Sequence, residues 1–271
     1  MNIMALISAL PGAAAQGLIW GIMAIGVYIT FRTLDIADLT VDGTMCTGGA
    51  VCIMMMMNGH NVWVAMLAAF IAGMLAGLAT GFFHTFMGIP AILSGILTQL
   101  ALWSVNLKIM GKSNQALNVD KYNLLVSLRY IKGVPIFKNT IVIVAIMIVV
   151  LIAILYWFFG TELGCSIRAT GCNSNMARAQ GINTNFNKVL GLMISNGLVA
   201  LSSALLAQYQ GFADINHVQG DISSCCEVLY GILDSEKVTL PIATAIYTGM
   251  VHDTGVFQYS STSPETMRIA G

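Results

Sequence analysis

The chain has 271 residues, of which 57% are hydrophobic and only 9% are Asp, Glu, Lys or Arg. A soluble domain of average composition carries about 25% charged residues, so lipid is the expected solvent for much of this chain. Twelve basic and twelve acidic residues cancel, which excludes a nucleic-acid-binding protein with a basic surface and a highly charged disordered chain. We therefore expect an all-α, polytopic membrane helix bundle.

The positions of the charges predict where the membrane segments lie. No charged residue occurs before Arg32, between Asp42 and Lys108, between Lys138 and Glu162, or between Lys188 and Asp214. A membrane-spanning helix needs about 20 predominantly apolar residues. Because turn-forming residues near 58–61 and 88–90 divide the longest of these stretches, we predict about six or seven segments in all. Six of them precede residue 214: 13–31, 44–57, 62–83, 89–107, 139–161 and 189–213.

Two of these segments have distinctive features. Segment 44–57 is short for a full crossing, and we expect it to be broken or re-entrant. Such backbone survives at membrane depth only where protein surrounds it or where it lines a cavity. Segment 62–83 carries Gly73, Gly77 and Gly81 at intervals of four residues, which places them on one helix face. This spacing predicts close packing, either against another helix of the bundle or at a subunit interface.

Polar residues in or beside the predicted spans are the candidates for a translocation path. A charge at the centre of a membrane helix costs roughly 2.5–3.5 kcal/mol on insertion scales, so the acids of stretch 32–43 must lie at an interface or beside a cavity. This stretch is either an ordinary interfacial loop or an unwound element near the path. Polar groups in 89–107 and 189–213 either bond between helices or line the path. The candidate path residues are Asp38, Thr40, Asp42, Ser94, Asn106 and Asn196.

The stretch 160–188 joins two predicted spans and has the pattern of a short helix outside the membrane. Asn173 can cap this helix, and Gly181 can end it. Met176 and Ala177 offer an apolar knob, and Arg168 and Arg178 offer positive charge. Such a helix suits docking into a groove of a soluble partner; the alternative is a surface helix without a partner.

This stretch resembles the cytoplasmic coupling segment of ABC-importer permeases of the branched-chain amino acid and ribose type. The matching residues are Gly164, Ile167, Arg168, Ala169, Gly171, Asn173, Ala177, Gly181 and Ile182. Cys172 stands where the family usually has an acid. Stretches 30–43, 94–98 and 106–112 resemble a subgroup of these permeases known as uncharacterised or aromatic amino-acid type. The resemblance runs from about residue 10 to residue 216.

The resemblance implies a permease subunit of a binding-protein-dependent ABC importer, a multi-pass protein of the bacterial inner membrane that moves a small solute such as an amino acid. A second permease copy or a homologue would complete the pore, and an extracytoplasmic binding protein would deliver the substrate. A soluble ABC ATPase would dock on the coupling residues, which are Arg168, Gly171, Asn173, Met176, Ala177, Arg178, Gly181 and Ile182.

The energy source is expected to lie in the partner subunit. Gly111-Lys112-Ser113 resembles the end of a phosphate-binding loop, but Asn106 stands where that loop requires its first glycine. We therefore expect this chain to hold no nucleotide, cofactor or metal and to have no enzymatic activity of its own. Its expected contacts are the two soluble partners, a permease copy, the substrate and membrane lipid, without nucleic acid.

Three points remain open at the level of the sequence. The resemblance fades from His217, so we divide the chain into a permease domain, 1–216, and a tail, 217–271, which is either genuinely divergent or the product of truncation or a frame shift. Basic residues favour the orientation opposite to the family's, because loop 108–139 carries more of them than the coupling loop. The functional alternative is a secondary transporter or channel, which would need no ATPase.

Overall fold

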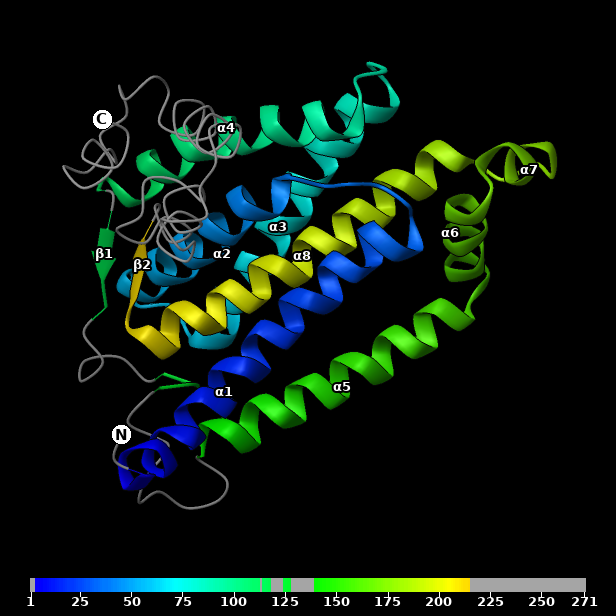
Figure 1. Ribbon diagram of the computed structural model, residues 1–271. Coiled ribbons are helices and arrows are strands. Elements are labelled where there is room, and N and C mark those ends of the chain that lie inside the picture. The colour runs from blue at the N-terminus through cyan, green and yellow to red at the C-terminus, as the bar shows by residue number, and fades with distance from the viewer. Residues whose placement is uncertain (1–2, 113, 118–123, 128–138, 215–271) are drawn as a thin grey trace, which may run out of the picture. The chain divides into compact units, whose positions relative to one another are not determined.

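The computed structural model describes residues 3–112, 114–117, 124–127 and 139–214, which lie within one compact unit, Met1–Ile215 (Figure 1). The helices are α1 (Ile3–Tyr28), the π-helical turn η1 (Ile29–Thr33), α2 (Thr40–Met57), α3 (Val62–Thr85), α4 (Ala91–Met110), α5 (Thr140–Gly160), α6 (Glu162–Cys172), α7 (Ser174–Ala179) and α8 (Thr184–Gln210). Strands β1 (Asn114–Ala116) and β2 (Phe212–Asp214) pair antiparallel, with Gln115 opposite Ala213. The predicted tail, 217–271, lies outside the described residues.

Within the described part of the chain, six helices are long and apolar enough to cross a membrane, which confirms the predicted all-α polytopic bundle. They are Leu10–Thr33, Thr40–Met57, Val62–Thr85, Ala91–Met110, Thr140–Gly160 and Thr184–Gln210. Successive spans run in alternating directions, so α6 and α7 lie at one end of the bundle and the β-ribbon lies at the other (Figure 1). The last span begins at Thr184, earlier than the predicted residue 189.

The second span differs from the prediction, because α2 is one continuous helix. Its 18 residues correspond to a length of about 27 Å. It begins at Thr40 rather than at residue 44 and so includes the charged residue Asp42 in its first turn. A negative charge is favourable there, because it lies near the positive end of the helix dipole. The irregular backbone precedes this helix: the chain leaves η1 and runs without helical structure through 34–39. At Asp35 the backbone is left-handed, with φ of 55°.

Helices α3 and α8 pack closely through the glycine face predicted from the sequence. A Cβ atom on Gly77 would overlap the Leu192 carbonyl group of α8, and one on Gly73 would overlap the Asn196 carbonyl group. At Gly81 the added atom would lie 3.0 Å from the Cα atom of Val189. The three glycines therefore let two backbones approach within one subunit, which is the first of the two interpretations that the spacing allowed.

Helix α8 forms the centre of the bundle, while α5 lies at its edge. Most α8 residues are buried, and α8 packs against α1, α2 and α3. Helix α5 packs mainly on α1 and α6 and buries only Thr140 and Val144. A cavity of about 620 Å³ between α1, α3, α5 and α8 is lined only by apolar and aromatic side chains. Because it offers a solute no polar group, we do not place the translocation path there.

Candidate translocation path and coupling surface

Three predicted path residues, of which Asp38 is half-buried and Thr40 and Asn196 are buried, meet in a hydrogen-bond network between the start of α2 and helices α3 and α8. The amide Nδ2 of Asn196 donates to Asp38 Oδ2 at 2.7 Å, and Thr44 Oγ1 donates to Asn196 Oδ1 at 2.7 Å. The hydroxyl groups of Thr40 and Thr80 are hydrogen-bonded at 2.7 Å. The backbone N–H of Thr40 also donates to Asp38 Oδ1, at 2.9 Å. We call Asp38, Thr40, Thr44, Thr80 and Asn196 the polar cluster.

The polar cluster lies inside the bundle and is internally satisfied. Thr40, Thr44 and Asn196 are completely buried, and Asn196 lies near the middle of α8. Its Nδ2 atom also donates to the Leu192 carbonyl group at 3.1 Å. Burying an unpaired amide or hydroxyl group costs roughly 2–7 kcal/mol, depending on the reference state. The mutual bonds avoid this cost and hold the first turn of α2 against α3 and α8.

The stretch 34–39 brings Asp38 to this position by crossing the bundle in a non-helical conformation. Helix α4 approaches its end closely, because a Cβ atom on Gly95 would lie 2.9 Å from the backbone nitrogen of Leu39. Of the acidic stretch 32–43, residues 34–39 are non-helical: Leu34 and Ile36 are buried, whereas Asp35, Ala37 and Leu39 are exposed.

The other three predicted path residues lie outside the polar cluster. Ser94 is buried on α4, and its hydroxyl group donates to the Ala91 carbonyl group of the same helix at 2.8 Å. Asn106 is completely buried; its Nδ2 atom lies 3.5 Å from the Gly43 carbonyl oxygen, while its Oδ1 atom has no partner among the described residues. Asp42 is half-buried, and its carboxylate has no hydrogen-bond or ion-pair partner in the described part of the chain.

Sequence reasoning missed two members of the polar cluster, although the sequence carried a signal for each. Thr44 lies one helical turn after Thr40, so the two share a face once α2 is known to begin at Thr40. Thr80 precedes Gly81 and follows Ala76 by one turn, on the face of α3 that buries its small residues. Polar groups on a packed face of a membrane helix usually find a partner within the bundle.

The predicted coupling loop contains two helices rather than one. The missed helix is α6, whose N-cap is Thr161: its Oγ1 atom accepts from the Gly164 N–H at 3.4 Å. The predicted helix is α7, with Asn173 Oδ1 accepting from the Met176 N–H at 3.0 Å. Gly181 is left-handed, with φ of 82°, and ends this helix as expected.

The coupling residues divide into those that face outward and those that shape the loop. Met176 is 60% exposed, and Arg168 and Arg178 are also exposed. Ala177, by contrast, is only 5% exposed. The prediction of an apolar knob formed by both residues is therefore wrong for Ala177, whose side chain faces the protein, and only Met176 projects outward.

The remaining coupling residues act on the conformation of the loop. The exposed Asn173 caps α7, and the Ile182 N–H donates to the Ala177 carbonyl group at 3.1 Å beyond Gly181. Gly171 faces inward, where a Cβ atom would overlap the carbonyl group of Thr33. These residues determine where the outward-facing side chains lie.

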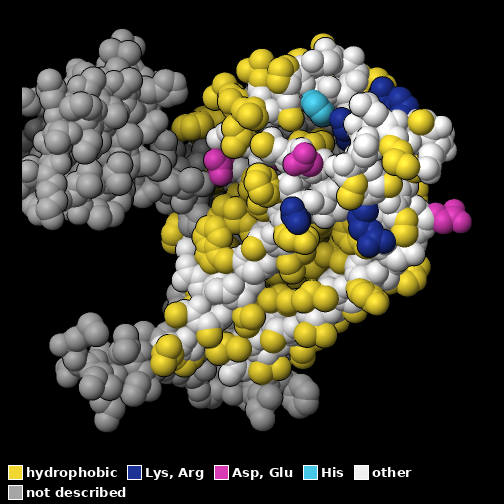
Figure 2. Space-filling view, turned by 45° about the vertical axis from the view of Figure 1, so that its right-hand side comes forward, with side chains coloured by type: hydrophobic (Ala, Val, Ile, Leu, Met, Phe, Trp, Pro, Cys, Tyr) yellow, Lys and Arg dark blue, Asp and Glu magenta, His cyan; other side chains and the backbone are white. Residues whose placement is uncertain are grey.

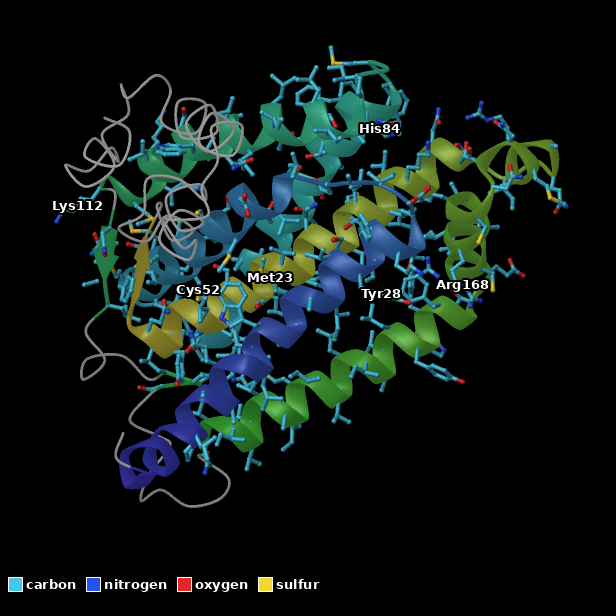
Figure 3. The ribbon with its side chains drawn as sticks, in the orientation of Figure 1. Met23, Tyr28, Cys52, His84, Lys112 and Arg168 are labelled. Carbon is cyan, nitrogen blue, oxygen red and sulfur yellow. The ribbon has the colours of Figure 1, made fainter. Side chains whose placement is uncertain are left out.

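Four of the described cations lie at the end of the bundle that carries α6 and α7. They are Arg32 in η1, Arg168 in α6, Arg178 in α7 and Lys188 near the start of α8. The view in Figure 2 brings this end forward and shows Lys and Arg side chains among apolar ones. Arg168 and Lys112 lie at opposite ends of the bundle (Figure 3). The basic residues Lys121, Arg129, Lys132 and Lys138 of the opposite loop lie outside the described residues.

The two regions offer different side chains: hydrogen-bonding groups in the polar cluster, and exposed cations and Met176 in the α6–α7 loop. The polar cluster offers a carboxylate, an amide and hydroxyl groups, which recognise solutes through hydrogen bonds. In the described ranges, no three His, Cys, Asp or Glu side chains come together as a metal site would require. A multi-helix membrane bundle with a polar cluster as well as apolar clusters in its interior, and with an exposed helical loop at one end, is compatible with a membrane transport protein.

Comparison with known families agrees with this class. Residues 10–262 match the family described as "Branched-chain amino acid transport system / permease component". The chain belongs to this family: it is a permease component of an ABC transporter and a multi-pass protein of the plasma membrane. The family is a transporter component rather than an enzyme. The match continues past residue 216, where the visible resemblance had ended.

Individual relatives come from several bacteria. A tyrosine transport system permease protein of Clostridioides difficile (strain R20291) is 38% identical over 247 residues, which cover 89% of this chain and 79% of the relative. An uncharacterized protein of Rickettsia prowazekii (strain Madrid E) is 38% identical over 75% of this chain and 69% of its own length. A galactofuranose transporter permease protein of Escherichia coli (strain K12) is 28% identical over 72% of this chain and 55% of its own length. No solved structure gives a significant match.

Proposed function

We propose that this chain is the membrane-spanning subunit of a binding-protein-dependent ABC importer that takes up an amino acid with energy from ATP hydrolysed by a partner subunit. A second copy of the chain or a homologous permease completes the pore. An extracytoplasmic binding protein delivers the substrate, and a soluble ATPase docks at the α6–α7 end of the bundle, which faces the cytoplasm.

The observation that carries this proposal is the shape of the α6–α7 loop in a chain of this family. Met176 projects from a capped helix, and the same loop exposes the cations Arg168 and Arg178. Helix α7 itself is held firmly, since Arg178 Nη2 donates to Thr184 Oγ1 at 3.1 Å. An exposed apolar side chain and exposed cations in one loop suit a groove of a soluble protein.

The polar cluster is the proposed part of the translocation path within this subunit. Asp38 is its only partly exposed member, whereas Thr40, Thr44, Thr80 and Asn196 are buried around it. Asp38 gives it a carboxylate, which can accept hydrogen bonds from a protonated amino group. Tyrosine is the first substrate to test, because the 38% identical relative is a tyrosine transport system permease protein.

A pull-down from native membranes tests the partner assignment. We expect the tagged chain to recover a soluble ABC ATPase, and we expect Met176→Glu combined with Arg178→Glu to abolish this recovery. Asn175→Ala is the matched control, because Asn175 is exposed on the same helix and has no hydrogen-bond partner among the described residues. Equal recovery of the ATPase by the double variant and the control would refute docking at α7.

Uptake by proteoliposomes tests the transport assignment. With the ATPase and the binding protein present, labelled tyrosine should accumulate only when ATP is supplied on the α7 side. Uptake that requires no ATPase would instead support the alternative function, a secondary transporter or channel. ATP-dependent uptake of another amino acid would retain the importer and replace the substrate.

A further inference from the structure

Helix α6 has an inner side that no docking partner can reach, and this side contacts the non-helical stretch 34–39, here called the crossing segment. Gly171 of α6 lies against the Thr33 carbonyl group and the Leu34 Cα atom, so closely that a Cβ atom would overlap the carbonyl group. Ile167 of α6 is completely buried and packs in one apolar cluster with Leu34 and Ile36. The start of the crossing segment therefore rests on α6.

The same start is also enclosed by α8. The Leu34 side chain fills a notch at Gly191, where a Cβ atom would overlap it. Helix α6 is joined to the first turn of α8 as well, because Asn187 Nδ2 donates to Ser166 Oγ at 2.6 Å and to Thr170 Oγ1 at 3.0 Å. Leu34 is thus held between α6 and α8, the central helix of the bundle.

The other end of the crossing segment is the polar cluster. Asp38 bonds to Asn196 at 2.7 Å and to the Thr40 N–H at 2.9 Å, and Leu39 passes close to Gly95. Only residues 35–37 separate Leu34, at the first contact, from Asp38, at the second. The segment forms no helix or strand. The Ile36 N–H donates to the Thr30 carbonyl group at 3.0 Å, which ties the segment to the preceding helix.

We propose that the crossing segment transmits the position of α6 to the polar cluster, with Gly171 and Leu34 as the positioning residues of this link. The inference rests on the proposed function and deepens it, because it assigns the step between ATPase docking and the path. A displacement of α6 would carry Leu34 with it through the Gly171 and Ile167 contacts. Because only three residues separate Leu34 from Asp38, a shift of Leu34 would displace Asp38 and change its bond to Asn196.

The experiment uses two variants that change no residue of α7. Gly171→Ala forces α6 away from Thr33, and Leu34→Ala empties the notch at Gly191 without overpacking. Cys172→Ala is the control, since Cys172 is exposed beside Gly171 and has no hydrogen-bond partner among the described residues. The first readout is hydrogen–deuterium exchange of the peptide containing Thr40 in the purified full-length chain. The second is the number of substrate molecules taken up per ATP hydrolysed by the reconstituted importer.

The proposal expects at least tenfold faster exchange at Thr40 in both variants, and at least tenfold less uptake per ATP while the ATPase still co-purifies. A merely structural role would lower uptake and ATPase recovery together and would leave their ratio unchanged. Wild-type exchange at Thr40 in both variants would overturn the link and leave the importer assignment standing. If no ATPase co-purifies with the wild-type chain, the proposed function fails, whereas the exchange measurement still decides whether α6 and Thr40 are connected.

Discussion

Asp38 and Asn196 are separated by 158 positions in the sequence, yet their side chains are joined by a hydrogen bond of 2.7 Å. The bond connects a non-helical stretch that precedes α2 to the middle of the most buried helix. It is supported on both sides: Thr44 donates to the Asn196 oxygen, and Thr40 donates its N–H to the second oxygen of Asp38. The orientation of the amide is therefore determined by its neighbours.

This arrangement predicts the effect of a charge change at Asn196. Asn196→Asp brings a second carboxylate to within hydrogen-bond distance of Asp38, and the lost amide donor leaves a buried acceptor without a partner. Such a loss costs roughly 1–3 kcal/mol, and we expect uptake to fall at least tenfold. The double variant Asp38→Asn with Asn196→Asp exchanges the two groups, so the pair again consists of one amide donor and one carboxylate acceptor. Uptake that the double variant fails to recover would contradict a role for this pair in the path.

The glycine face of α3 predicts a difference between two helices. Gly77→Ala places a Cβ atom against the Leu192 backbone of α8, and overpacking of this kind typically costs about 1–3 kcal/mol. Gly21→Ala on α1 is the matched control, because no atom of the described chain lies within 4 Å of the added group. Thermal unfolding in detergent should show a clearly lower Tm for the first variant alone. A similar loss of Tm in both variants would show that the α3–α8 contact is not the cause.

These results show which features local sequence patterns can predict. The spacing of charges predicted the six spans, because the hydrocarbon core sets a minimum apolar length. The four-residue spacing of Gly73, Gly77 and Gly81 predicted close packing, and Asn173 with Gly181 predicted α7. Each of these signals is contained within a few helical turns, so it needs no knowledge of the tertiary structure.

The features that escaped prediction depend on contacts between distant parts of the chain. Thr80 and Asn196 come together only because α3 and α8 are adjacent, and no local pattern states which helices pair. Helix α6 was missed because its apolar side is narrow and carries Gly171, which is unfavourable in a helix unless a tight contact requires it. Ala177 was assigned outward because a six-residue helix shows too little periodicity to define its faces.

The backbone at Asp35 predicts an unusual tolerance to glycine. Its φ of 55° lies in the left-handed region, which costs roughly 1–2 kcal/mol for most residues and little for glycine. We expect Asp35→Gly to preserve stability and Asp35→Val to lower the Tm, since a β-branched side chain fits this conformation poorly. Ala37→Val is the control, because Ala37 is also exposed in the crossing segment and its φ is not positive. Equal destabilisation by the two valine variants would contradict a conformational cause.

The cap of α7 predicts a graded effect on ATPase docking. Asn173→Ala removes the side chain that accepts from the Met176 N–H at 3.0 Å, and the loss of such a cap costs about 1 kcal/mol. If an ordered α7 is required for docking, the Kd for the ATPase should rise about fivefold. Asn175→Ala removes an amide from the same helix without removing a cap, so its Kd should match that of the wild type. Both constants can be measured by titrating the purified ATPase onto nanodisc-embedded permease. An unchanged Kd for Asn173→Ala would mean that α7 folds against its partner, or that docking uses another surface of the same end.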